Sequence, residues 1–472
     1  MNRQPPQRSV LRMLLSALTG KTPEQAKQPV HPSQGPAPDD RDAWRAYWKE
    51  QGQPWRTEPE IDEKRQEYLA QRRITSPDIE HGIYPFKDVE LNRADIEWLL
   101  ATHENGRGPV DWNDERQRKR EGLDLRGTDL SSIDLSNLPL ARLRGGLTEI
   151  EWNPFIDEPK KRSGIVLEKA DLRGSHLEGA ILRRANLREA SLSDTYLQEA
   201  DLESSHLESA RLRRANLEGA SLRWAYLEDS HLRKAVLKNT DLRSTHLDGT
   251  YLSEIVLWDD QHIGPQLADV HWEGANLSVV EWPKLRQLGD EHNARKQYDD
   301  QGVLKSKAQA LEGYETAVRA NRQLAIALQN QGINEYASYF AYRAQALQLH
   351  VFRLQMLQQG IPLRQRARAL GAWLFSWFLF LLAGYGYKPG RSFLAYLLVI
   401  GTFMAFYLLL DPHLAWYEAI VVSLTAFHGR GFSPSTFSPS NPLSIASAIE
   451  AFVGLIIEVT FIATLTRRFF GQ

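Results

Sequence analysis

The sequence of 472 residues contains no cysteine, which excludes disulfides, thiolate chemistry and cysteine-ligated zinc sites. It also lacks a charge excess, since 57 basic and 59 acidic residues leave a formal net charge of −2. This balance argues against a general nucleic-acid binder. No phosphate loop, nucleotide-binding glycine pattern or nucleophile and base pair occurs, so we expect no enzymatic activity, no catalytic residue, no cofactor and no metal.

Residues 1–41 offer little that could fold. The apolar patch "VLRMLLSALTG" is short, is interrupted by Arg12, and precedes a proline-rich tract. A signal peptide would need a longer apolar run and a small-x-small cleavage site. We therefore predict a disordered tail over this segment.

Residues 42–121 show apolar stripes at helical spacing in "RDAWRAYWKEQ", "EIDEKRQEYLAQRR" and "RADIEWLLATH". Four tryptophans of this region, Trp44, Trp48, Trp55 and Trp98, could line a ligand pocket or form a small core. Aromatic residues at helical spacing are more often core, so we predict a small helical cap on the segment that follows.

Leucine then recurs at every fifth position from Leu167 to Leu257, which gives (257−167)/5+1 = 19 leucines. The residue two places before each leucine is nearly always small, as in Ala170 and Ser175. Neither 3.6 nor 2.0 divides five, so a helix and a flat strand are both excluded. The period predicts a chain that turns a corner every five residues, with the leucine and the small residue inside.

The repeats "ADLRG", "ANLRE", "ADLES" and "ANLEG" resemble the A(D/N)LXX motif of the pentapeptide-repeat family. The resemblance implies a right-handed, four-sided β-helix with four repeats per coil. We assign it residues 122–282, with an insertion at 144–164 where the leucine spacing breaks. Coils stacked at about 4.8 Å place residues twenty apart above one another.

The outward positions of the repeats carry 15 acidic and 13 basic residues between Ile165 and Leu257. Some members of the family resemble acidic duplex DNA and bind topoisomerases, and this mixed surface departs from that pattern. His206, Tyr226 and His246 are twenty apart and should stack outward. Surface packing is a better account of this column than metal binding, because metal ligands converge on one point.

Residues 283–362 return to a helical pattern, strongest in "LEGYETAVRANRQLAIALQNQG" and "INEYASYFAYRAQALQLHVFRLQ". Gly332 between them suits a helix end. We predict a helical hairpin linker with contacts from Tyr336, Tyr339 and Tyr342. It resembles the tetratricopeptide-type hairpin found between solenoid and bilayer in pentapeptide-repeat membrane proteins.

Three apolar stretches follow, at 369–387, 392–410 and 443–466, and about twenty apolar residues cross a bilayer. If only the last two cross, nearly all flanking cations fall on one side. These cations are Arg364, Arg366, Arg368, Lys388, Arg391, Arg467 and Arg468. The first stretch, within 363–390, is then predicted to be an interfacial helix, with a third span as the alternative. Both termini and the repeats would be cytoplasmic.

Residues 391–472 form the predicted membrane pore domain, with spans at 392–410 and 443–466. A helix expected at 414–427 is too short to cross, and "SLTAFHGRGF" adds glycine-containing backbone at membrane depth. The order of span, re-entrant helix, glycine turn and span resembles two-span members of the potassium-channel superfamily. This resemblance implies a tetramer in a bacterial or archaeal cytoplasmic membrane.

The filter-like loop at 425–432 departs from the TVGYG pattern of potassium filters, so potassium selectivity does not transfer. Its residues are Thr425, Ala426, Phe427, His428, Gly429, Arg430, Gly431 and Phe432. Symmetry would turn Arg430 into a ring, and arginine rings favour anions. Alternatively, Arg430 pairs with an acid such as Glu450 and holds the loop in shape. His428 is a candidate for pH sensitivity or for a structural hydrogen bond.

Glu450, Gly454 and Glu458 lie four residues apart on one face of the last span. Each is a candidate to line a pore or to pack between helices, and Gly454 is also a candidate hinge. We therefore expect an oligomeric, anion-preferring or weakly selective pore-loop ion channel whose solenoid serves as sensor or scaffold for an unknown cytoplasmic partner. The alternative is a membrane-anchored interaction scaffold that does not conduct.

Overall fold

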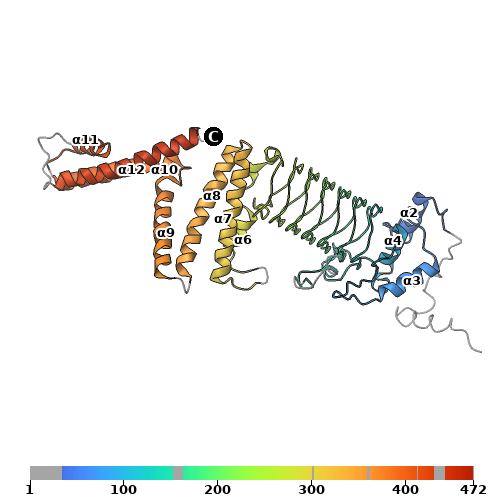
Figure 1. The fold of residues 1–472 in the computed structure, drawn as a ribbon. Coiled ribbons are helices and arrows are strands. Elements are labelled where there is room, and N and C mark those ends of the chain that lie inside the picture. Colours follow the sequence, from blue (N-terminus) through green and yellow to red (C-terminus); the bar gives the residue numbers. More distant parts are fainter. Residues whose placement is uncertain are drawn as a thin grey trace, which may run out of the picture.

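The structure, a computed structural model, describes residues 35–152, 163–299, 302–358, 362–411, 413–429 and 442–470. Its elements follow one another along an extended molecule (Figure 1). A group of short helices lies at one end of a stack of coils, a pair of long helices closes the other end, and the C-terminal helices extend from that pair. The predicted tail at 1–34 lies outside the described residues.

Four helices form the N-terminal cap: α2 (Arg41–Glu50), α3 (Glu63–Arg73), α4 (Arg93–Ala101) and the single turn α5 (His103–Gly106). The first three begin at the N-cap side chains of Asp40, Asp62 and Asn92, which accept hydrogen bonds from backbone amides of the first turn. The three helices predicted from apolar spacing are thus confirmed. Their tryptophans are core residues, since three are buried and the fourth packs against the core.

Arg93 of α4 joins the cap to the solenoid. Its guanidinium donates to the Asp134 carboxylate at 3.0 Å and to the Ser136 carbonyl oxygen at 3.1 Å, and its Nε donates to the fully buried Glu97. Burial acts to raise the pKa of Asp134, but the Ser136 hydrogen bonds and the cations Arg41 and Arg93 lower this pKa to about 2. The cap therefore covers the first coil through both apolar packing and ion pairs.

Each repeat of the solenoid folds as one tight turn. In the repeat that begins at Leu167, the Ala170 amide donates to the Leu167 carbonyl oxygen at 3.1 Å, and Lys169 adopts φ +58°. A positive φ at this third position is typical of a type II turn. The leucines and the small residues are buried throughout the repeats, which confirms the predicted inward positions.

Neighbouring coils are joined by single parallel β-bridges, one every five residues, such as His206 to Tyr226 and Asn216 to Val236. Four bridges per twenty-residue coil agree with four repeats per coil. Within the described residues these bridges are isolated and do not extend into strands. The right-handed, four-sided β-helix therefore stays a prediction.

The bridge partners also locate the insertion. Asp124 pairs with Arg144 twenty residues on, whereas Asp129 pairs with Val166, which is 166−129 = 37 residues on. The difference, 37−20 = 17 residues, is chain extruded from the coil, and stacking resumes above it. An insertion within the predicted range 144–164 is thus confirmed, but it begins later than predicted, because Arg144 still pairs with Ile181 of the next coil. Its part at 153–162 lies outside the described residues.

The solenoid ends in the short helices η3 (Leu277–Val279), η4 (Trp282–Lys284) and α6 (Gly289–Arg295), followed by the hairpin of α7 (Lys307–Asn330) and α8 (Asn334–Leu357). Helix α7 begins with a capping box between Ser306 and Gln309. Gly332, at φ +74°, makes the turn between the two helices. The predicted hairpin is confirmed, and its residues Leu324, Leu328 and Phe340 join the solenoid core.

Four further helices complete the described chain: α9 (Leu363–Ala383), α10 (Pro389–Leu410), α11 (Trp416–Phe427) and α12 (Pro442–Phe470). Helix α9 runs beside α8, while α10 and α12 extend across its direction (Figure 1). Gly384, in the left-handed region at φ +52°, ends α9. Pro389 begins α10 at a position where the missing amide hydrogen costs nothing.

Candidate functional site

The C-terminal helices place a short helix between two long ones. Helix α11 packs against both α10 and α12, which also pack against each other. Its 12 residues extend about 18 Å, which is less than the roughly 30 Å of a hydrocarbon core. By contrast, α9, α10 and α12 are each long and apolar enough to cross a membrane.

The C-terminal end of α11 lies against the middle of α12. The two backbones approach so closely at Gly454 that a Cβ there would lie 2.2 Å from the carbonyl oxygen of Phe427. The Phe427 ring is buried with Leu382 and Ile457, and the Tyr396 ring meets it edge-on at 4.8 Å. Gly454 is thus a close-packing site, one of the two roles considered from the sequence, and it permits α11 to dock.

Glu450 is completely buried and connects three helices. Its carboxylate accepts a hydrogen bond from the Tyr407 hydroxyl of α10 at 2.6 Å, and its other oxygen bonds to the Ser423 hydroxyl of α11. No cation contacts this carboxyl group among the residues with described side chains. Within one chain, Glu450 occupies the interhelical position that the sequence left as the alternative to lining a pore.

Glu458 lies one turn beyond Gly454 and pairs with His428, the residue that follows α11. Tyr396 of α10 brings its hydroxyl to 3.4 Å from the other ring nitrogen of His428. The side chains of His428 and Glu458 are 38% and 36% exposed, so this pair faces outward from the three-helix packing. The geometry gives His428 the structural contact considered from the sequence and leaves pH sensitivity a prediction.

The remaining predicted loop residues divide into two groups. Thr425 uses its hydroxyl to bond the Val421 and Val422 carbonyl oxygens of its own helix, Ala426 is buried, and Gly429 has a φ of +65°. The other three, Arg430, Gly431 and Phe432, lie outside the described residues. The structure therefore shows the helical half of the predicted filter loop.

The outer faces of α10 and α12 carry large exposed apolar side chains. Buried positions of α12 follow one another at intervals of three or four from Ser447 through Glu450 and Gly454 to Ile457, and Thr464, seven residues further on, lies on the same face. The opposite face is exposed and apolar. Its members are Ile445, Ile449, Phe452, Leu455, Val459 and Ile462. Such a surface is suited to lipid or to another subunit.

Lys388 and Arg391 lie where α9 meets α10, whereas Arg364, Arg366 and Arg368 lie in the first turns of α9, at its other end. Arg391 at the start of α10 donates to the Phe380 carbonyl oxygen at 2.8 Å and stacks over the Phe380 ring, and Ser392 bonds the Leu382 carbonyl oxygen. Helix α12 contacts α9, and its C-terminal end points back toward the same end of the bundle (Figure 1).

The outer surface of the solenoid is bound together by its own charges. Arg188 and Glu208 form an ion pair at 2.7 Å across neighbouring coils, and Arg214 and Asp194 form another at 2.6 Å. The mixed surface noted in the sequence is thus partly self-neutralised. The predicted ring column is confirmed as well, since Tyr226 stacks between His206 at 4.8 Å and His246 at 5.0 Å.

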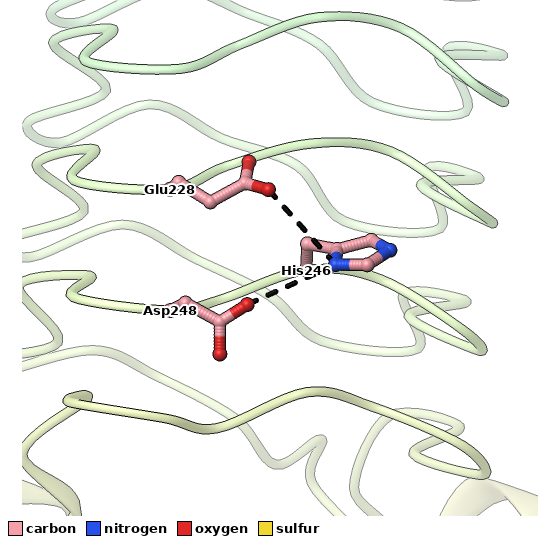
Figure 2. A group of neighbouring side chains, drawn as sticks. All are labelled: Glu228, His246 and Asp248. Carbon is pink, nitrogen blue, oxygen red and sulfur yellow. Dashed lines mark ion pairs between the residues drawn. The ribbon is translucent and has the colours of Figure 1, made fainter.

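One group on this surface has donors suited to a metal: Glu228, His246 and Asp248 (Figure 2). The His246 Nδ1 atom lies 3.9 Å from a Glu228 oxygen and 3.8 Å from an Asp248 oxygen. His271 extends the stack and fixes the His246 ring at 4.3 Å. Ion pairing of one histidine with two carboxylates accounts for the same arrangement.

Several contact residues escaped the sequence reasoning. Tyr407 and Ser423 bond to Glu450, and Tyr396 contacts His428. Each helix carries further hydroxyl residues, such as Thr402 in α10 and Thr425 in α11, so the sequence offers no signal that would single out these three. Glu228 and Asp248 were missed because each lies two positions after a stacked ring, in a neighbouring column.

The comparisons concern the middle of the chain. The family described as "Pentapeptide repeats (8 copies)" matches residues 165–203, 190–229 and 220–259. The pentapeptide repeat protein Rfr23 of the cyanobacterium Cyanothece 51142 is 29% identical over 32% of this chain and 91% of its own, with a TM-score of 0.20.

A pentapeptide repeat protein of the Arabidopsis thaliana thylakoid lumen is 24% identical over 29% of this chain and 73% of its own, with a TM-score of 0.15. The plasmid-mediated fluoroquinolone resistance protein QnrB1 is 14% identical over 36% and 87%, also with a TM-score of 0.15. No curated protein matches the chain. The predicted repeats are confirmed, and no activity follows from these similarities.

Proposed function

From a chain that contains pentapeptide repeats and three helices able to span a membrane, we propose a pore-loop ion channel, assembled as a tetramer, with a cytoplasmic solenoid. The solenoid is taken as a right-handed, four-sided β-helix that serves as sensor or scaffold. The observation that carries the proposal is the docking of α11 against Gly454. A helix too short to cross, held by its C-terminal end at the middle of a spanning helix, is the arrangement of a re-entrant pore helix.

Charge distribution supports the orientation. Lys388 immediately precedes α10 and Arg391 lies in its first turn, and α12 returns to that end of the bundle. If α10 and α12 cross, the solenoid, the hairpin and these cations share one side, which the positive-inside rule makes cytoplasmic. Because α9 runs along α8 and across the direction of α10, it then lies at the membrane surface as an interfacial helix.

Selectivity is proposed from the sequence of the loop. Four copies of Arg430 would form a ring of positive charge that attracts anions and repels cations. Glu450 is already bound to two hydroxyl groups in the described chain, which disfavours it as the partner that neutralises Arg430. We therefore propose an anion-preferring or weakly selective pore, with Glu458 and His428 as the described side chains available to face it.

Recording from the purified chain in planar bilayers tests the function. We expect unitary currents whose reversal potential follows the chloride gradient. Arg430→Ala should weaken that preference, whereas Arg430→Lys, which keeps the charge, should retain it. A reversal potential that follows potassium would contradict the proposed selectivity.

A second candidate function is a membrane-anchored scaffold that does not conduct. It is favoured by the enclosed position of Glu450, which shows α10, α11 and α12 to be packed through a satisfied polar contact without help from another subunit. Complete absence of current from well-folded protein, under every gradient and voltage applied, would favour this scaffold over the channel.

A further inference from the structure

A cavity of about 730 Å³ lies where three parts of the molecule meet. Its walls come from the end of the solenoid at Trp282–Arg286, from the first turns of α8 at Asn334–Tyr342, and from the turn between α9 and α10 at Gly386–Lys388. It is therefore placed where the cytoplasmic solenoid and the first membrane span come together. Its lining includes no residue of the predicted pore loop or of the ring column.

The walls combine aromatic surface with unpaired positive charge. Tyr336, Tyr339, Tyr342 and Trp282 supply the aromatic part. The Lys388 ammonium group lies 4.5 Å from the centre of the Tyr342 ring. Such a contact holds the ammonium group against the ring without neutralising its positive charge.

Arg286 is the second cation of the cavity. Among the residues that the structure describes, neither Arg286 nor Lys388 forms an ion pair with an acid. Glu335, exposed in the first turn of α8, is the acidic residue of the lining. Two cations against one acid leave the cavity with a net positive charge.

The backbone on the solenoid side is held in place. The Tyr339 hydroxyl donates to the Arg286 carbonyl oxygen at 2.7 Å and accepts from Arg343 at 3.0 Å. Arg343 is itself fixed by the buried Glu291 at 2.7 Å. The wall that carries Arg286 is therefore preorganised, and binding a ligand would not require this wall to be ordered.

We propose that this cavity binds the phosphate-bearing headgroup of an anionic glycerophospholipid from the membrane in which the chain is embedded. Lys388 and Arg286 bind the phosphate, the aromatic residues surround the glycerol region, and the acyl chains extend along the apolar surface of α10. The orientation that brings the cavity to the membrane surface rests on the proposed function. A bound lipid would then link the position of the solenoid to the start of α10.

The neighbouring surface favours a lipid as the source of the phosphate. Leu394, Leu397 and Leu398 are exposed on α10 about two to three turns after Lys388, and these apolar side chains suit acyl chains better than a soluble anion. Anionic lipids also gather at the cytoplasmic leaflet, where a lysine or arginine near the surface contributes about fivefold in affinity. A free phosphate compound is the competing source.

The test is native mass spectrometry of the full chain in neutral detergent, titrated with phosphatidylglycerol or with phosphatidylcholine. We expect preferential binding of phosphatidylglycerol, and a loss of about 25-fold in the double variant Arg286→Gln with Lys388→Gln, since two cations contribute about fivefold each. The matched control, Arg364→Gln with Arg366→Gln, removes the same charge from the start of α9 and should keep the preference.

A third variant protects the test against misfolding of the double variant. Ser338→Phe places a ring in the cavity while it keeps both cations, and it should also abolish the preference. Equal losses in the control pair would show general surface attraction and overturn the site. Displacement by inorganic phosphate, with no preference between the two lipids, would overturn the lipid as its ligand.

Lipid binding is measured by mass spectrometry and conduction by electrical recording, so the lipid site and the channel can be refuted independently. Preferential lipid binding in a chain that never conducts would refute the channel alone. Conduction without preferential binding would refute the lipid site alone.

Discussion

Gly454→Ala tests the docking of α11 most sharply, because one methyl group is added at the point of closest approach. The new Cβ would lie 2.2 Å from the Phe427 carbonyl oxygen, whereas an ordinary contact of carbon with carbonyl oxygen is about 3.3 Å or more. The end of α11 must therefore move by about 1 Å. The obstacle is backbone, so a rotation of a side chain cannot relieve it.

The free-energy change of docking comes from overpacking, because α12 gains the helix propensity of alanine whether or not α11 is docked. Overpacking of this kind costs about 1–3 kcal/mol. We expect the docked state of α11 to lose about 2 kcal/mol. The matched control is Gly401→Ala in α10, where nothing lies within 4 Å of the added Cβ.

Hydrogen exchange measured by mass spectrometry on protein in lipid nanodiscs resolves this local effect. Amides of α11 should exchange about 30-fold faster in Gly454→Ala, since 1.4 kcal/mol corresponds to tenfold. Gly401→Ala should leave exchange in α11 unchanged. Equal exchange of α11 in the two variants would refute the close approach at Gly454.

Three further predictions concern other parts of the chain. Ser209 adopts a φ of +58°, which glycine tolerates better than serine, so Ser209→Gly should stabilise the solenoid against denaturant by about 1 kcal/mol. Ser253 belongs to another turn and lies one residue before the positive-φ position of that turn, so Ser253→Gly should destabilise the solenoid. Burial raises the pKa of Asp290 from 3.8 to about 7, so the folded state holds a proton that the unfolded chain has released. Stability should therefore fall by about 2–3 kcal/mol from about pH 5 to about pH 8 in urea unfolding, and Asp290→Asn should remove this fall. Glu450→Gln should keep the hydroxyl contacts and retain thermal stability in detergent, while Glu450→Ala should lower it by about 3 kcal/mol; equal stability of these two variants would contradict the three-helix contact.

The repeats could be predicted from the sequence because their information is local. Leu167, Lys169 and Ala170 form one turn among themselves, so period and residue type are sufficient to identify it. The insertion was also visible, because it interrupts the period. The number of extruded residues, 17, could be determined only from the bridge between Asp129 and Val166.

The candidate site depends on contacts that sequence spacing does not contain. Glu450 meets Tyr407 and Ser423, which are 43 and 27 residues away in the chain. A carboxyl group in an apolar helix indicates either a partner or water, and the choice follows from which helices pack together. In the same way, the glycine at 454 allowed hinge and packing interpretations until the carbonyl oxygen of Phe427 was placed beside it.

The order of the apolar C-terminal helices was predictable for a different reason. Length and apolar content separate α10 and α12 from the shorter α11. Helix length and mean hydropathy are properties of many residues together, so a single unusual residue does not change them. The packing of α9 along α8 does not follow from length or hydropathy. It depends on a specific helix pairing, and charge counting alone left α9 as either an interfacial helix or a third span.

Cysteine accessibility tests the central claim most directly, because the chain contains no cysteine and each introduced thiol is therefore unique. Single variants His413→Cys and Pro442→Cys mark the two ends of the re-entrant segment, and Lys388→Cys marks the turn before α10. In right-side-out vesicles the account predicts that an impermeant thiol reagent modifies the first two positions and spares Lys388→Cys until the membrane is opened. Modification of only one of the first two positions would mean that the segment between them crosses the membrane, and the re-entrant helix would be contradicted.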